Sequence, residues 1–282
     1  MAGEVSLFVA VVLLFGGGYG LHFGLQRRGP YGLVTETPTT EIRQLREPGL
    51  VELKGTARET DDHGTFESPI GRRSCVFAAW SVEEYQSSGK HSSWNTVASG
   101  VRSVPFAVDD DTGRVTVAPG DHVDAAGLLT GTGDAAASDG VTAGPVLAEF
   151  DSFPRVVETE AGEAPPPEVR RFVAGEGVVD EEPDAPLLDI GRSHGDRRYY
   201  ERTIGPDDRV YVLGEATARN PDAVGSFRTE DLVVRPPEST MVVSNQREQA
   251  LVRQLRLYKL GVVGGTVAVA AGLLLLGGYT PP

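Results

Sequence analysis

The chain of 282 residues is 40% hydrophobic and 23% charged, and this balance excludes a wholly disordered protein. Its 26 Lys and Arg residues stand against 40 Asp and Glu residues, so the formal net charge is −14. Such a chain repels phosphate backbones, which excludes a general nucleic-acid binder. A single cysteine excludes an internal disulfide and every zinc or iron–sulfur module built from several thiolates.

The type of positive residue points to the source of the chain. Only Lys54, Lys90 and Lys259 are lysines, and the other cations are arginines. An acidic, lysine-poor surface suits a cytosol with molar salt, where the Debye length is about 3 Å and neighbouring carboxylates barely repel one another. We therefore expect a halophilic microbe, most simply an archaeon, although drift in an acidic mesophilic protein gives the same composition.

The chain begins with an apolar segment. Residues 5–25 contain no Asp, Glu, Lys or Arg, and about 20 apolar residues cross the hydrocarbon core of a bilayer as a helix. A cleaved signal peptide carries positive residues ahead of its apolar stretch, whereas here Arg27 and Arg28 follow it. The sequence therefore favours a retained transmembrane anchor over residues 1–28.

Strand patterns dominate the middle of the chain. A short helix with Thr37 as its cap opens this part, Pro105 implies an edge or a bulge, and residues 205–208 read as the turn of a hairpin. Alternating or β-branched stretches predict strands over residues 50–57, 75–85, 96–108, 114–118, 198–204, 209–218 and 231–235. We expect a mainly β (α+β) domain over residues 29–243, with a short helix at 167–173 and loops at 131–144 and 179–197.

A helix and a second apolar segment end the chain. Ser244 is the expected cap of a juxtamembrane helix over residues 244–259. This helix either runs into the bilayer or lies at its interface. Residues 260–279 contain no charged side chain, which predicts a second transmembrane anchor over residues 260–282.

Positive residues flank both spans on the side of the middle domain. The positive-inside rule therefore predicts a cell-membrane protein with two spans, a cytoplasmic middle and both termini outside. The candidate contacts with anionic lipid or with a partner are Arg27, Arg28, Arg253, Arg256 and Lys259.

Small residues recur at helical spacing in both spans. Gly16, Gly20 and Gly24 share one helix face, as do Gly264, Ala268 and Gly272. Such faces let helix backbones approach closely in lipid, within one chain or between two copies. General enrichment of glycine in membrane helices is the alternative.

No set of residues reads as a catalytic, cofactor-binding or metal site. Cys75 lies in an apolar strand pattern, where a buried, inert thiol is the rule, although Arg72 and Arg73 are close enough in sequence to lower its pKa. No pair among the five histidines has metal-ligand spacing. Residues 109–113 resemble the start of a calcium loop, but Arg114 begins a strand, so we expect a hairpin turn.

Trp94 is the one aromatic residue singled out as a candidate partner contact. It follows a polar run, and an exposed tryptophan often anchors a partner. A core position reached from a loop is the favoured alternative.

Several segments together resemble one known family. They are Pro69-Ile70, Cys75-Val76-Phe77, Trp80 to Tyr85, Trp94, Val104-Pro105-Phe106, Gly113-x-Val115-x-Val117, Tyr199-x-Glu201, Gly205 to Asp208, Val210 to Ala216 and Val242-Val243-Ser244. In this order they resemble the GIDE domain, also called the "beside a membrane" domain, of the MULAN or MAPL type of membrane E3 ubiquitin ligase.

The resemblance implies a domain held between two transmembrane helices and a ubiquitin-transfer function. In that family a RING finger follows the second helix in the cytosol and recruits the ubiquitin-conjugating enzyme. The single cysteine here offers no counterpart to the RING's zinc ligands, so no ligase residue is carried over.

The sequence thus predicts a non-catalytic binding or scaffold domain, anchored in the lipid bilayer at the cytoplasmic face. Its expected partner is a protein, a lipid headgroup or a second copy associating through the glycine-rich spans. The alternatives are a ligase-related activity, latent or with a RING supplied in trans, and a hydrolase that uses Cys75.

Overall fold

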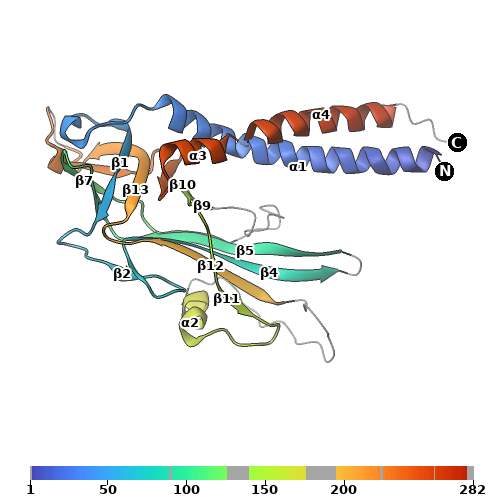
Figure 1. The fold of residues 1–282 in the computed structure, drawn as a ribbon, viewed down its shortest axis with the longest axis horizontal. Helices are drawn as coiled ribbons and strands as arrows, with labels where there is room; N and C mark the ends of the chain where they lie inside the picture. Colours follow the sequence, from blue (N-terminus) through green and yellow to red (C-terminus); the bar gives the residue numbers. More distant parts are fainter. Residues whose placement is uncertain are drawn as a thin grey trace. The chain divides into compact units, whose positions relative to one another are not determined.

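A computed structural model describes residues 2–88, 91–125, 140–175, 195–222, 225–256 and 258–277. The chain divides into two compact units, a β-rich unit over residues 38–246 and a helical unit made of residues 1–37 and 247–282. Figure 1 gives the order of their elements along the chain. Most of the two predicted loops, at 131–139 and 179–194, lies outside the described residues.

Five strands of the β-rich unit close into a small barrel. In order around the barrel they are β1 (Gly49–Arg58), β6 (Phe106–Asp109), β7 (Arg114–Val117), β14 (Leu232–Arg235) and β13 (Arg209–Ala218). Each pairs with the next, and β13 pairs back with β1 through eight residue positions. Closure leaves these strands without free edges.

The barrel shares its core with an extension of the sheet. From β13 the sheet continues through β15 (Met241–Ser244), β10 (Val146–Glu149) and β9 (Gly140–Ala143). The strands turn Leu53, Phe106, Val212, Leu232 and Met241 inward, and all five are fully buried. These side chains belong to one continuous hydrophobic core.

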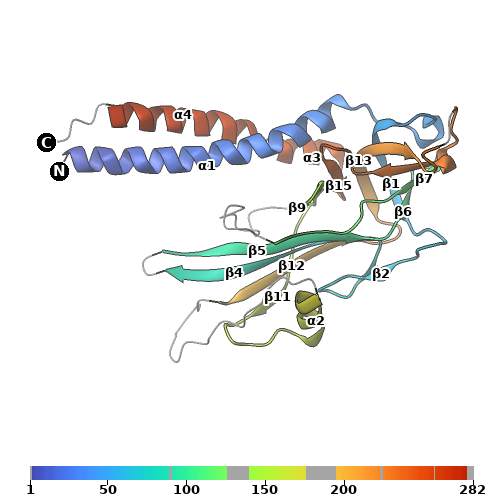
Figure 2. The same ribbon diagram turned by 180° about the vertical axis from the view of Figure 1, so that it is seen from behind.

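A second sheet is antiparallel throughout. Its order is β11 (Arg155–Thr159), β12 (Arg197–Ile204), β4 (Phe77–Ser88), β5 (His91–Ser103) and β8 (His122–Ala125). Figure 2 shows β4 and β5 as its long central pair. Gly100 of β5 lies against the indole of Trp80. A Cβ at this position would come within 2.5 Å of Trp80 Cζ2, so the close contact requires a residue without a side chain.

Helix α2 (Pro167–Gly175) packs on the face of this sheet that carries Trp80. Phe172 meets Trp80 edge-on, with ring centroids 4.7 Å apart and planes at 85°, a favourable aromatic geometry. Val169 completes this second, smaller core together with Ile70 and Tyr199. The predicted helix at 167–173 is confirmed.

Short elements complete the β-rich unit. The strands β2 (Phe66–Glu67) and β3 (Ser74–Cys75) form a two-stranded sheet around the intervening loop. Two 3₁₀ turns are η1 (Ile42–Gln44) and η3 (Thr229–Asp231). The structure therefore corrects the opening helix predicted with Thr37 as its cap, which is only the single turn η1.

The predicted hairpin around residues 205–208 is wrong, although both of its strands exist. β12 pairs with β4 and β11, whereas β13 pairs with β1, β14 and β15, so the two strands belong to different sheets. The connection is instead bonded to β1, since Asp207 N donates to Ala57 O at 2.9 Å and Ala57 N to Asp208 O at 2.8 Å. Turn residues predict that the chain changes direction but do not select the strand that it joins.

Two further predictions need correction, and one turn is confirmed. The strand expected over residues 96–108 ends at Ser103 and resumes at Phe106, because Pro105 lacks the N–H that a ladder needs. Ser244 lies in β15 rather than capping the following helix, whose N-cap is Arg247. The turn at Asp110 is a hairpin turn as predicted, with its carboxylate accepting bonds from Thr112 N at 2.9 Å and Gly113 N at 3.1 Å.

The helical unit contains α1 (Ala2–Glu36), α3 (Glu248–Leu255) and α4 (Tyr258–Gly277). Glycines let α1 and α4 touch. A Cβ added to Gly24 would lie 2.6 Å from Val262 N, one on Gly265 2.5 Å from Leu21 N, and one on Gly272 2.8 Å from Leu14 Cγ. The two helices therefore run antiparallel in backbone contact, which any larger side chain at these positions would prevent.

The contact stripe is not the one expected from four-residue spacing. On α1 it contains Gly17, Gly20 and Gly24, whereas a Cβ on Gly16 would meet nothing within 4 Å. On α4 it contains Gly261, Gly265, Ala268 and Gly272, and Gly264 faces open space. Alternating steps of three and four residues are the heptad spacing of helices that wrap around each other in a left-handed sense.

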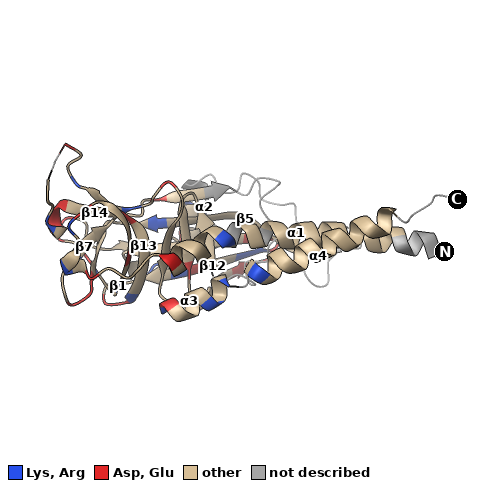
Figure 3. Cartoon of the chain, turned by 90° about the horizontal axis from the view of Figure 1, so that it is seen from above, with Lys and Arg blue, Asp and Glu red and all other residues tan. Residues whose placement is uncertain are grey.

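The helical unit exposes large apolar side chains. Phe8, Phe15 and Leu274 are 70%, 78% and 78% exposed, and residues 7–22 of α1 and 260–277 of α4 include no Asp, Glu, Lys or Arg (Figure 3). Among the described residues, one helical run, Glu248–Gly277, is long and apolar enough to cross a membrane, and Leu7–His22 is a shorter apolar stretch. One membrane span is thus supported, and the second remains a prediction.

Candidate functional site

A buried carboxylate organises the loop between β2 and β3. Glu201 of β12 is 4% exposed, and its oxygens accept hydrogen bonds from Ser68 Oγ at 2.7 Å, Ile70 N at 2.7 Å and Gly71 N at 2.8 Å. A Cβ on Gly71 would lie 2.7 Å from Glu201 Oε2, so a larger residue there would displace the carboxylate from its present position. The loop is therefore fixed to the second sheet at three points.

The fixed loop presents an arginine in an uncommon backbone conformation. Arg72 has φ of +52°, a left-handed conformation that costs a non-glycine residue about 1–2 kcal/mol. Its guanidinium forms an ion pair with Glu67. Strain of this kind persists only where the surrounding contacts hold the backbone in place, as Glu201 does here.

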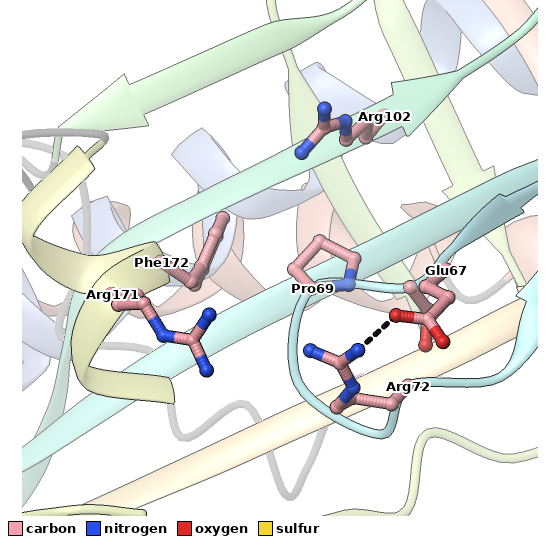
Figure 4. Close-up of a pocket in the computed structure, with 7 residues that line it drawn as sticks. Glu67, Pro69, Arg72, Arg102, Arg171 and Phe172 are labelled. Carbon is pink, nitrogen blue, oxygen red and sulfur yellow. Dashed lines mark hydrogen bonds and ion pairs between the residues drawn. The ribbon is translucent and has the colours of Figure 1, made fainter. Parts of the chain in front are cut away.

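Next to this loop lies an open hollow of about 330 Å³. It is lined by residues of three separate segments, namely Glu67, Ser68, Pro69, Arg72, Arg102, Arg171 and Phe172. Figure 4 shows Arg72 and Arg171 pointing toward one another across it, with Arg102 on the strand above. Three guanidinium groups against one carboxylate make the hollow electropositive, in contrast to the chain's charge of −14.

Cys75 lies behind this loop as an inert thiol. It is fully buried, and its Sγ donates to Phe66 O at 3.7 Å. Burial raises the pKa of the thiol to about 12; the nearby Glu201 carboxylate adds to the shift, and Arg102 opposes it. Since the thiolate is the nucleophilic form, this environment argues against a hydrolase that uses Cys75.

We expect Cys75 to resist alkylation in the folded chain. At pH 8 a thiol with a pKa near 12 is ionised to only about 10⁻⁴, and burial also blocks the reagent. Iodoacetamide followed by mass spectrometry should find Cys75 unmodified until guanidinium unfolds the chain. Alkylation of the native chain as fast as that of the unfolded chain would contradict this environment.

Trp94 lies on strand β5 rather than on a loop, and it is half-buried. The Arg198 guanidinium lies 3.8 Å from the centroid of its ring, and the ring of Tyr85 is 5.2 Å away. One face of the indole is thus occupied within the domain. Its role as a partner contact stays a prediction.

The basic candidate contacts all belong to the helical unit. Arg28, Arg253, Arg256 and Lys259 are exposed, while the side chain of Arg27 lies outside the described residues. Lys259 Nζ lies over the rings of Tyr31 and Tyr258, at 5.3 Å and 5.9 Å from their centroids. Aromatic rings and a long cationic side chain at a helix end are typical of the membrane interface.

The sequence analysis did not single out Arg102, Arg171 or Phe172. Arg72 and Glu201 were noticed, the first for its nearness to Cys75 and the second within a family motif, but nothing linked them. The available signal was a pair of adjacent arginines, Arg170 and Arg171, on a helix of a strongly acidic chain.

Among the residues that the structure describes, no group of three or more His, Cys, Asp or Glu is arranged to hold a metal ion.

Comparison with known protein families gives one match. The model of the family described as "GIDE: E3 Ubiquitin ligase" matches residues 81–130, a segment that includes β5, β6, β7 and β8. No curated protein and no solved structure matches the chain. The resemblance to GIDE proteins that the sequence motifs predict is therefore confirmed over residues 81–130.

Proposed function

We propose that this protein is a membrane-anchored, non-catalytic binding domain related to the membrane domain of E3 ubiquitin ligases. The observation that carries the proposal is the GIDE match over residues 81–130 in a chain that also has an apolar helical hairpin. The β-rich unit is the binding part, and α1 and α4 are the anchor. In this proposal the β-rich unit faces the cytoplasm and both chain ends face outward.

The packing of the helical unit supports insertion of both helices. α1 and α4 touch through backbone and small side chains, while large apolar side chains such as Phe8 and Phe15 point outward. That arrangement is costly in water and favourable in lipid, where packing of small residues replaces the hydrophobic effect between helices. Leu7–His22 is the apolar stretch of α1, and in this proposal it spans the bilayer beside α4.

The chemistry of the β-rich unit supports binding rather than catalysis. The thiol of Cys75 is buried and its pKa is raised. The buried carboxylate of Glu201 is occupied by three hydrogen bonds that hold a loop. These groups have structural roles, whereas the electropositive hollow beside them is open to solvent.

Membrane extraction and protease accessibility test the proposal. After lysis, alkaline carbonate should leave the chain in the membrane pellet and detergent should release it. Protease added to intact cells should spare residues 38–246, and permeabilised cells should lose them. Release by carbonate, or digestion of the β-rich unit in intact cells, would contradict the anchor or the orientation respectively.

A ligase-related activity is the second candidate, favoured by the description of the matching family. This candidate predicts that the source cell contains ubiquitin-like conjugates of other proteins. These conjugates should disappear when the gene is deleted and reappear when an intact copy of the gene is restored. Unchanged conjugates, together with partners that crosslink to the chain in its native membrane, would favour the binding domain.

A further inference from the structure

The arginine-lined hollow stands apart from the rest of the acidic chain. Arg102 comes from β5, Arg171 from α2 and Arg72 from the loop between β2 and β3. All three side chains are exposed, and Arg72 is paired with Glu67. Within the described ranges, neither Arg102 nor Arg171 forms an ion pair with a carboxylate, so two positive charges face the hollow without a neutralising group.

Each wall of the hollow is held by packing behind it. Glu201 fixes the loop that carries Arg72 and Pro69, and Phe172 is fixed edge-on against buried Trp80. The guanidinium of Arg102 lies 5.7 Å from the centroid of the Phe66 ring, and Arg171 Nε donates to Pro167 O at 3.3 Å. A site built in this way loses little conformational freedom when a ligand enters.

We propose that this hollow binds an acidic peptide segment of a partner protein, with carboxylates paired to Arg102 and Arg171 and an apolar side chain packed on Phe172 and Pro69. The inference rests on the proposed function, because it assigns the chemistry of the partner that the membrane-anchored domain would bind. Guanidinium groups match carboxylates in a bidentate geometry and are weakly hydrated, so they suit a protein interface.

Two features of the hollow favour an acidic peptide over a phosphate compound. Phe172 and Pro69 form an apolar wall, for which a bare phosphate has no counterpart. The volume of about 330 Å³ accommodates a few side chains, and the open shape lets a chain enter and leave at the surface.

The experiment selects peptides against the full-length chain in lipid nanodiscs. The probe is a phage-displayed library of random nine-residue peptides, which removes any bias in the choice of sequence. The wild type should enrich peptides in which Asp or Glu lies next to Leu, Ile or Phe. The rest of the chain is negatively charged and should attract some basic peptides nonspecifically. A selection that enriches basic peptides but no acidic ones would overturn the proposal.

Variants then locate the binding site. In fluorescence anisotropy with the most enriched peptide, Arg102→Gln and Arg171→Gln should each weaken binding about tenfold, because each removes one charge-assisted contact. Arg170→Gln is the matched control, since Arg170 is an exposed neighbour on α2 that does not line the hollow. Thermal unfolding of every variant near the wild-type temperature shows that the fold is intact.

Two outcomes would overturn the proposal while leaving the membrane anchor untouched. One is equal binding of the peptide by the wild type, Arg102→Gln and Arg171→Gln. The other is displacement of the peptide by millimolar inorganic phosphate but not by millimolar acetate, which would make the hollow a phosphate site. Carbonate extraction of the same variants tests the anchor separately.

Discussion

Glu201→Ala is expected to lower the free energy of unfolding of the β-rich unit by about 4 kcal/mol. The change leaves the buried N–H of Ile70 and the half-buried N–H of Gly71 without their acceptor, at about 1–3 kcal/mol for a buried group, and leaves a cavity behind the loop. Glu201→Gln keeps the shape and one acceptor oxygen, so about half of this loss is expected. Denaturant titration should report both changes through tryptophan fluorescence, because Trp80 and Trp94 lie in the second sheet.

Glu47→Ala provides the control for this prediction, because Glu47 is exposed and surface substitutions change stability by about 0.5 kcal/mol or less. Glu201→Ala should also weaken acidic-peptide binding, since the loop that carries Arg72 would no longer be fixed. A Glu201→Ala chain as stable as Glu47→Ala would mean that the three hydrogen bonds do not hold the loop.

Gly265→Leu is expected to separate the two long helices. The Cβ alone would approach Leu21 N to 2.5 Å and Gly17 O to 2.6 Å, so the backbones must move apart. Tyr31 and Tyr258 have ring centroids 4.9 Å apart, and cysteines placed at these two positions report the closed pair. Oxidation in nanodiscs should crosslink them about tenfold more slowly when Gly265→Leu is present, which corresponds to the cost of overpacking.

Gly264→Leu is the matched control, because a Cβ at Gly264 meets nothing within 4 Å. It should leave the crosslinking rate within the chain unchanged. The same variant tests the predicted self-association, since Gly16 and Gly264 face away from the α1–α4 contact. Equal crosslinking in Gly265→Leu and Gly264→Leu would contradict the packing of the hairpin.

Local patterns predicted most strands, but they could not predict which strands pair. Alternation along residues 50–57 and 209–218 is a property of neighbouring residues, and β1 and β13 appear where it occurs. The closure of the barrel depends on pairing between these strands, about 160 positions apart in the sequence. The turn at 205–208 misled the prediction, because turn chemistry carries no information about the distant strand β1.

The candidate site was beyond prediction for a related reason. Arg102 and Arg171 come together because α2 packs on the second sheet through Phe172 and Trp80. That contact depends on Gly100, whose missing side chain makes room for the indole.

In the spans, a four-residue repeat of glycine indicated the correct helices, but the contact follows alternating steps of three and four residues and therefore includes Gly17 rather than Gly16.

The central place of β13 has a consequence for biosynthesis. This strand pairs with β1, β14 and β15, so the ring closes only after the ribosome has released residues up to Arg235. Until then β7 and β13 each lack their neighbour β14, and β1 itself has only β6 as a partner until β13 is made, which favours slow assembly and contact with chaperones. A nascent chain stalled before residue 232 therefore exposes an unpaired strand edge and becomes a substrate for quality control.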